Sequence, residues 1–85
     1  MIKGPLLSSN QYAVLMVDGA TGHILTITGT IYQSDGQDIY FVFDDLEAAR
    51  LFIKGKQNDN DTLEFNVYKS DYQFLECWDA TRWKQ

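Results

Sequence analysis

Two side chains of this sequence could support nucleophilic or acid–base chemistry, the imidazole of His23 and the thiol of Cys77, and each is the sole residue of its type. Nucleophilic catalysis needs a base within hydrogen-bond reach of the nucleophile and a third group that orients the base. His23 follows a glycine-rich turn, and Cys77 lies in an apolar row without a Cys-x-x-Cys spacing. We therefore interpret His23 as a solvated turn residue and Cys77 as a small core residue, and we predict a protein that is not an enzyme.

The segment at residues 59–64 has the oxygen-rich composition that calcium prefers, because acidic and amide side chains precede Glu64. The calcium loop of an EF-hand also requires a glycine at its sixth position and a glutamate at its twelfth, and this segment has neither. The turn at residues 18–22 likewise lacks the lysine and the following helix of a phosphate-binding loop. We predict a solvated acidic loop at 59–64, no metal site and no cofactor.

The chain is acidic, with 12 Asp and Glu residues against 7 Lys and Arg residues and a net charge of −5. This balance disfavours nucleic acid as a partner, since phosphate binding depends on clustered cations. The acidic side chains gather at positions 35, 38, 44, 45 and 47 and again at 59, 61 and 64. They could form a surface that binds a basic partner, although an excess of charge for solubility is the simpler interpretation.

The single cysteine excludes an intramolecular disulfide and favours a reducing compartment. The first residues lack the apolar core of a signal peptide, and no stretch approaches the roughly 18 apolar residues of a membrane span. These features predict a cytoplasmic protein that does not bind membranes.

The segment from Tyr40 to Gly55 organises the predicted fold, because a strand leads there into the chain's most convincing helix. Asp44 has the side chain of an N-cap and Glu47 can complete a capping box, so the helix is expected to begin at about Asp45. Gly55 is expected to end it. The apolar face comprises Leu46, Ala49, Phe52 and Ile53, and the polar face comprises Glu47, Arg50 and Lys54.

Five segments are predicted to be strands, and two glycine turns are predicted between the first three of them. The apolar run Tyr12–Val17 fits a strand shielded on both faces. Ile24–Tyr32 alternates clearly and contains Gly29, which predicts a bulge or a close approach. Glycine turns at residues 18–22 and 34–37 predict that it forms hairpins with Tyr12–Val17 and with the strand Asp38–Phe43. Strands are also expected at Leu63–Lys69 and Tyr72–Trp78.

The order of these elements, β-β-β-α-β-β, predicts an α+β fold with an antiparallel sheet of about five strands and one helix packed on one face. At 85 residues the chain is expected to form a single α+β domain, residues 1–85, with 1–10 and 79–85 as flanking segments.

The register of the last hairpin decides which residues face the helix. A two-residue turn at Ser70-Asp71 would place Glu76 opposite Phe65 in the core, where an unpaired carboxylate is costly. A longer loop avoids this cost, and we prefer it. It pairs Val67 with Leu75, Phe65 with Cys77, Tyr68 with Phe74 and Asn66 with Glu76.

The preferred register predicts an aromatic surface on the face away from the helix. It would comprise Tyr40, Tyr68, Phe74 and Trp78, with Tyr32 as a further candidate. Exposed aromatic patches of this kind commonly mark interfaces or ligand grooves. The alternatives are that residues 1–10 and the tail with Trp83 cover this face, or that the sheet rolls into a barrel.

These features favour a small non-enzymatic protein-interaction or regulatory module that acts as a homodimer or binds another protein. A second hypothesis is a small-ligand-binding protein whose pocket is lined by Tyr40, Tyr68, Phe74 and Trp78. A third is an acidic inhibitor or immunity-type protein that binds a basic partner.

Overall fold

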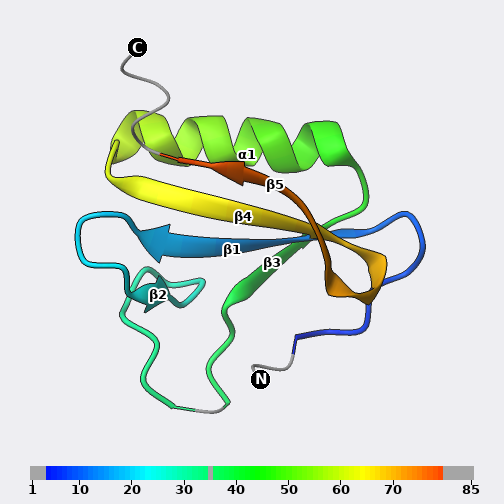
Figure 1. Ribbon diagram of the computed structural model, residues 1–85, viewed down its shortest axis with the longest axis horizontal. Coiled ribbons are helices and arrows are strands. Elements are labelled where there is room, and N and C mark those ends of the chain that lie inside the picture. The colour runs from blue at the N-terminus through cyan, green and yellow to red at the C-terminus, as the bar shows by residue number, and fades with distance from the viewer. Residues whose placement is uncertain (1–3, 35, 80–85) are drawn as a thin grey trace.

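Strand β1 (Tyr12–Asp18) lies inside the sheet because almost every residue of it is apolar and both of its faces are covered. The computed structural model describes residues 4–34 and 36–79, which form an antiparallel sheet with one α-helix against one face (Figure 1). The predicted α+β class is therefore confirmed. No helix within the described residues has the length and the apolar composition needed to cross a membrane.

The sheet has five strands, all paired antiparallel. Strand β4 (Leu63–Lys69) pairs with one side of β1, and β5 (Gln73–Trp78) pairs with the outer side of β4. The other side of β1 is shared: β3 (Tyr40–Phe43) pairs with its first half, and β2 (Ile24–Leu25) with its last residues. Strand β5 is therefore an edge of the sheet.

Helix α1 (Leu46–Asp59) begins one residue after Asp45, the start that a cap at Asp44 predicts. Its N-cap is Asp45, whose carboxylate accepts a hydrogen bond from the backbone N–H of Glu47 at 3.4 Å. Asp44 instead accepts a hydrogen bond from the side-chain amide of Gln11 at 2.9 Å. The prediction of Asp44 as the cap is therefore wrong: Asp45 accepts the capping hydrogen bond, and the Asp44 side chain contacts Gln11.

The helix also passes through Gly55, so the predicted stop there is wrong. Gln57 shows why the additional turn is stable: its side chain is buried, and its amide donates to the carbonyl of Leu63 at 3.0 Å. This contact connects the last turn of α1 to the start of β4. The helix then ends at Asp59, and the N–H of its C-cap residue Asn60 donates to the carbonyl of Lys56 at 3.0 Å.

The core between the helix and the sheet confirms the predicted apolar face of α1. Ala49 and Ile53 are fully buried, and Leu46 and Phe52 pack against the core. The ring centroid of Phe52 lies 4.5 Å from that of Phe41, 5.2 Å from Phe43 and 6.2 Å from Phe65. The buried members of this core are Val14, Met16, Leu25, Ala49, Ile53, Leu63, Phe65 and Val67.

The predicted strand at Ile24–Tyr32 is wrong beyond Leu25, because the chain folds back on itself. Gly29 adopts a φ of +91°, and the N–H of Thr26 donates to the carbonyl of Thr30 at 2.7 Å. The hydroxyl of buried Thr26 lies within hydrogen-bond distance of two further threonine hydroxyls. Gly29 therefore marks a tight turn, where the positive φ favours glycine.

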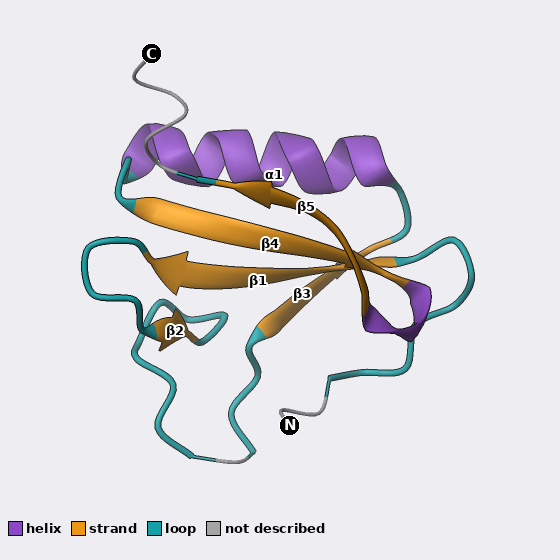
Figure 2. Cartoon of the chain, in the orientation of Figure 1, coloured by secondary structure: helices purple, strands orange, loops and turns teal. Residues whose placement is uncertain are grey.

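The predicted hairpin between Ile24–Tyr32 and Asp38–Phe43 is also wrong, because β3 pairs with β1. Figure 2 shows the connection between β2 and β3 as a loop on the side of the molecule opposite the helix. The N–H of Ile27 donates to the carbonyl of Asp38 at 2.9 Å and joins the two ends of this loop. Asp35, part of the predicted turn, lies outside the described residues.

The β4–β5 hairpin combines the preferred register with a shift of one residue. Tyr68 pairs with Phe74 as predicted, after a short 3-10 turn, η1 (Ser70–Tyr72). A bulge at Leu75 then shifts the pairing. The remaining pairs are Val67 with Glu76, Asn66 with Cys77 and Phe65 with Trp78, which corrects the predicted partners.

Candidate interaction surface

Three tyrosine rings form a cluster on the sheet face opposite the helix. The ring centroid of Tyr40 lies 6.3 Å from that of Tyr68 and 5.1 Å from that of Tyr72, and Tyr68 and Tyr72 are 6.2 Å apart. We call Tyr40, Tyr68 and Tyr72 the tyrosine cluster. Phe74 extends it toward the edge of the sheet, with its ring 6.1 Å from that of Tyr68 in an edge-to-face arrangement.

The residues of β1 beneath the tyrosine cluster are buried. Leu15 pairs with Tyr40, and Ala13 pairs with Tyr68, so both share the face of the cluster. Neither Ala13 nor Leu15 belongs to the helix-side core, yet both are buried. The prediction that this strand is shielded on both faces is confirmed, and the tyrosine rings provide much of the second cover.

The start of the described chain covers the outer side of this cluster. The hydroxyl of Tyr72 donates a hydrogen bond to the carbonyl of Pro5 at 2.6 Å. A Cβ atom at Gly4 would collide with the hydroxyl of Tyr72 and the ring of Tyr40, so only glycine permits this close approach. The alternative in which the N-terminal segment folds over this face therefore holds at Gly4 and Pro5. The tail with Trp83 lies outside the described residues.

The cover ends at strand β5, where two adjacent apolar side chains remain accessible. Phe74 is 59% exposed and Leu75 is 37% exposed. Both lie on the edge strand of the sheet. The exposed part of the aromatic surface is therefore limited to its Phe74 end.

The structure brings together three of the four predicted site residues, Tyr40, Tyr68 and Phe74. Trp78 lies elsewhere: it pairs with Phe65 and packs against the helix-side core, because the bulge at Leu75 reverses the faces of the residues that follow. Tyr32 lies in the turn after β2, where its N–H donates to the carbonyl of Ile24.

Sequence reasoning missed Tyr72 and Leu75. Tyr72 precedes Phe74 by two positions, so the alternation of the predicted strand could have indicated it. In the structure it reaches the cluster through a turn in which Asp71 and Tyr72 both have positive φ values. No periodic signal marks Leu75, because it is the extra residue of the bulge.

Glu76 lies on the helix side of the sheet, as the rejected register would require, but it has a partner. The guanidinium of Arg50 donates to both carboxylate oxygens of Glu76, at 3.1 and 2.8 Å. The indole N–H of Trp78 donates to Glu76 Oε2 at 2.6 Å. The hydrogen bond from Arg50, together with that from Trp78, holds the pKa of Glu76 below its usual value despite partial burial.

The two candidate nucleophilic or basic residues lie on different elements, His23 in the turn before β2 and Cys77 on β5. His23 is exposed, and its Nδ1 lies 2.9 Å from the hydroxyl of Thr21. Cys77 is half-buried and pairs with Asn66, on the face opposite the helix. The predicted core position of Cys77 is therefore wrong for the same reason as that of Trp78. The prediction that the protein is not an enzyme stays a prediction.

The acidic loop at residues 59–64 is organised by Asn60. The side-chain carbonyl of Asn60 accepts hydrogen bonds from the backbone N–H and the hydroxyl of Thr62, at 3.1 and 2.7 Å. Partial burial, followed by the nearby charge of Asp79, raises the pKa of Glu64. Within residues 4–34 and 36–79, no three His, Cys, Asp or Glu side chains are grouped as metal ligands would be.

Comparison of the chain with protein-family models, with curated proteins and with solved structures finds no significant match in any of the three.

Proposed function

We propose that this protein is a small non-enzymatic interaction module that forms a homodimer through edge strand β5. The observation that carries the proposal is the exposure of Phe74 at 59% beside exposed Leu75, on the strand that ends the sheet. An exposed phenylalanine on a sheet edge offers apolar area and backbone hydrogen-bonding groups at the same place.

Edge pairing suits two copies of one chain. Two identical β5 strands can pair antiparallel around a two-fold axis, so that each supplies the same surface to the other. Proteins commonly protect exposed edges with lysine or proline, and the β5 sequence QFLECW contains neither. The bulge at Leu75 is the irregular feature of this edge, and it restricts the register in which a second strand can pair.

Charge also favours this strand as the contact. The net charge of −5 opposes the approach of two copies over most of the surface. Glu76 is the charged residue of β5, and Arg50 of the same chain already neutralises it. The β5 strands of two copies could therefore pair without repulsion between two unneutralised glutamates of the strand.

Sedimentation velocity at tens of micromolar, compared across two matched variants, tests the proposal. Phe74→Glu introduces a charge at the proposed contact and is expected to give a monomer. Leu51→Glu is the control, because Leu51 is also 59% exposed but lies on α1. A dimer that persists in Phe74→Glu, or a wild-type protein that sediments as a monomer, would contradict the homodimer.

A cytoplasmic location is part of the same proposal. The chain has one cysteine and so forms no intramolecular disulfide, which suits a reducing compartment. Fractionation of cells that produce the protein is expected to recover it with cytoplasmic markers, and recovery with a membrane fraction would contradict the assignment.

A further inference from the structure

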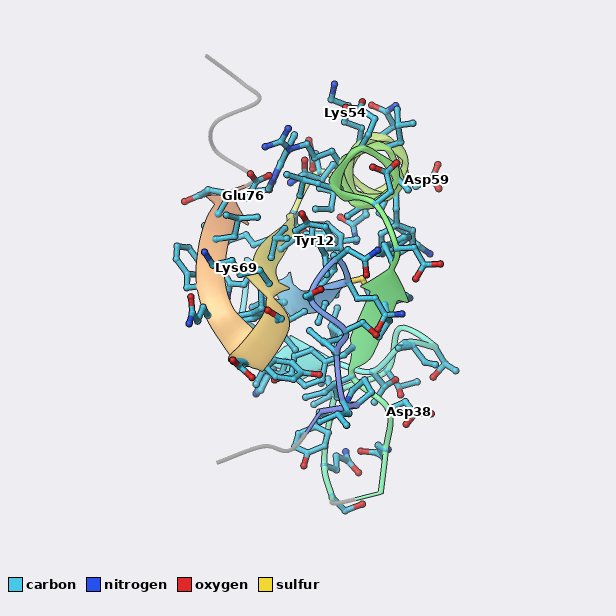
Figure 3. The ribbon with its side chains drawn as sticks, turned by 90° about the vertical axis from the view of Figure 1, so that its right-hand side faces the viewer. Tyr12, Asp38, Lys54, Asp59, Lys69 and Glu76 are labelled. Atoms are coloured by element: carbon cyan, nitrogen blue, oxygen red, sulfur yellow. The ribbon has the colours of Figure 1, made fainter. Side chains whose placement is uncertain are left out.

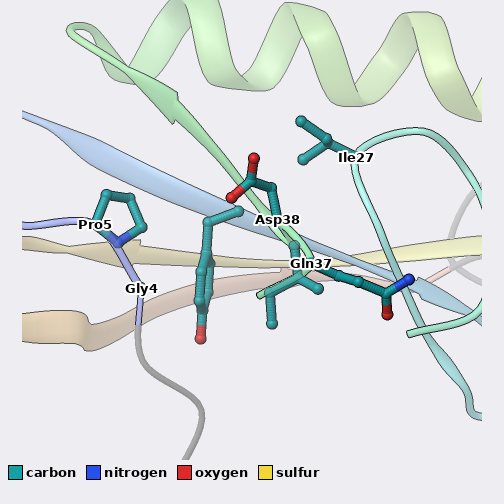
Figure 4. A pocket seen from close by; sticks show the side chains of 7 residues that line it. Gly4, Pro5, Ile27, Gln37 and Asp38 are labelled. Carbon is teal, nitrogen blue, oxygen red and sulfur yellow. The ribbon is translucent and has the colours of Figure 1, made fainter. Parts of the chain in front are cut away.

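A pocket of about 410 Å³ lies beside Tyr40, at the border between the tyrosine cluster and the loop that connects β2 to β3. Three separate segments form it: Gly4 and Pro5 from the start of the described chain, Ile27 from the turn after β2, and residues 37–40. Figure 4 shows Pro5 and Ile27 on opposite sides in this view, with Asp38 between them. Its volume falls in the range of about 300–1,000 Å³ that is usual for small-molecule sites.

The lining combines apolar side chains with polar groups, one of them charged. Pro5, Ile27 and Tyr40 contribute apolar or aromatic surface, Gln37 and Asp38 contribute polar surface, and Asp38 is the charged residue among those that line the pocket. Ile39 is buried almost completely, so its part of the pocket is fixed by the fold. A carboxylate next to an aromatic ring and aliphatic side chains suits a ligand that is cationic and apolar at once.

Hydrogen bonds and ring contacts hold these walls in place without a ligand. Tyr72 donates to the carbonyl of Pro5 at 2.6 Å and so fixes the N-terminal wall. The N–H of Ile27 donates to the carbonyl of Asp38 at 2.9 Å and joins the two loop walls. The ring of Tyr40 packs against Tyr68 and Tyr72, which limits its rotation. The site is therefore already ordered, and little of the binding free energy of a ligand would be lost in ordering it.

We propose that this pocket binds a small organic ammonium ion. The carboxylate of Asp38 would pair with the positive charge, the ring of Tyr40 would contribute a cation–π contact, and the accessible side chains of Pro5 and Ile27 would contact the alkyl groups. The pocket shares Tyr40 with the predicted ligand site but has none of its other residues. It is separate from edge strand β5, so the inference does not depend on the proposed homodimer.

Titration of the ¹⁵N-labelled protein with choline chloride, at constant ionic strength, tests the proposal by amide chemical shifts. Choline is expected to shift the resonances of Ile27, Ile39 and Tyr40 in a saturable manner. Its uncharged isostere 3,3-dimethylbutan-1-ol should bind at least about tenfold more weakly, because it lacks the charge that pairs with Asp38. Equal shifts with both compounds would overturn the cationic specificity.

Two charge-removing variants distinguish the pocket from the general acidity of the protein. Asp38→Asn is expected to weaken choline binding at least about tenfold. Asp59→Asn removes the same charge at the end of α1, near the top of the view in Figure 3 whereas Asp38 lies near its bottom, and should leave the affinity unchanged. The spectra themselves show whether each variant is folded. No saturable shift in the wild type, or equal weakening by both variants, would overturn the proposal.

Discussion

The two faces of the sheet are covered by different means. On one face, α1 covers a closed core in which Val14, Ile53, Phe65 and Val67 are the largest fully buried side chains. On the other face, the tyrosine cluster and the segment at Gly4 and Pro5 cover Ala13 and Leu15. The first cover is an element of secondary structure, whereas the second consists of side chains and a short extended segment.

The difference relates the type of aromatic residue on each face of the sheet to how completely that face is shielded from water. The rings between α1 and the sheet are mainly those of phenylalanines such as Phe41, Phe43 and Phe52, which have no polar group to satisfy, while Tyr12 and Trp78 pack partly buried against the same core. The rings of the opposite face are mainly tyrosines, whose hydroxyl groups can reach water or, as in Tyr72, a backbone carbonyl. A sheet face without a helix is therefore not necessarily an open one.

The largest expected effect is on the helix-covered face. Phe65→Ala should lower the free energy of unfolding by about 3–5 kcal/mol, because Phe65 is fully buried and its removal leaves a cavity. Phe74→Ala, on the exposed end of the opposite face, should change it by less than about 1 kcal/mol. Urea denaturation at low protein concentration measures both. Equal costs would show that Phe74 belongs to a closed core.

Replacement of a glycine should have opposite effects on the two sides. Gly4→Ala is expected to displace the N-terminal segment from Tyr40 and Tyr72 and to cost about 1 kcal/mol, including the hydrogen bond to Pro5. Gly55→Ala lies within α1 with open space around the position, and should stabilise the protein by about 0.5–1 kcal/mol. Thermal denaturation followed by circular dichroism measures both changes. Stabilisation by Gly4→Ala would contradict the close approach.

Acid should weaken the edge of the helix-covered face through Glu76. Because the folded-state pKa of Glu76 lies below its usual 4.5, its contribution is complete above that value and is lost as the pH falls through the folded-state pKa. Glu76→Gln should therefore lower Tm by about 1–5 °C at pH 7 and by progressively less as the medium becomes acidic. The raised pKa of Glu64 has the opposite effect on stability. Glu64 is present in both the wild type and the Glu76→Gln variant, so its effect cancels from the difference in Tm. A difference in Tm that is independent of pH would contradict the prediction.

Alkali should weaken the opposite face, with the smallest effect. Burial raises the pKa of Tyr40 and of Tyr72 above 10.0, and repulsion adds to it, from the Tyr68 phenolate at Tyr40 and from the Tyr40 phenolate at Tyr72. Their contribution to stability is therefore complete below pH 10.0 and is lost as the pH rises through the raised values. Tyr72→Phe should cost about 0.5 kcal/mol at neutral pH and make the alkaline loss shallower. Thermal denaturation between about pH 8 and pH 11 measures both, and an unchanged alkaline slope would argue against a role for Tyr72.

The sequence patterns predicted those parts of the fold that are determined within a short stretch of sequence. The continuous apolar run of β1 and the spacing of Leu46, Ala49, Phe52 and Ile53 are properties of short segments, and both are confirmed. The end of α1 was missed because it depends on the contact of Gln57 with Leu63, which the sequence around Gly55 does not reveal. The partner of β3 was missed because the turn at residues 34–37 indicated the wrong neighbour.

The candidate site was predicted in part for the same reason. Alternation placed Tyr40, Tyr68 and Phe74 on one face, since each lies in a regular part of its strand or next to the turn. Alternation failed at Trp78, because a single extra residue reverses every later position and leaves no periodic signal. The partner of Glu76 was missed because Arg50 lies 26 positions away, on an element whose placement was unknown.

The bulge at Leu75 also gives the protein a useful chemical handle. Because it places Cys77 on the face opposite the helix, a thiol-directed fluorophore or spin label at this position would sit on edge strand β5 itself and avoid the phenylalanine core. The chain has one cysteine, so such labelling is site-specific without further mutation. The distance between the labels of two chains would then report directly on their association.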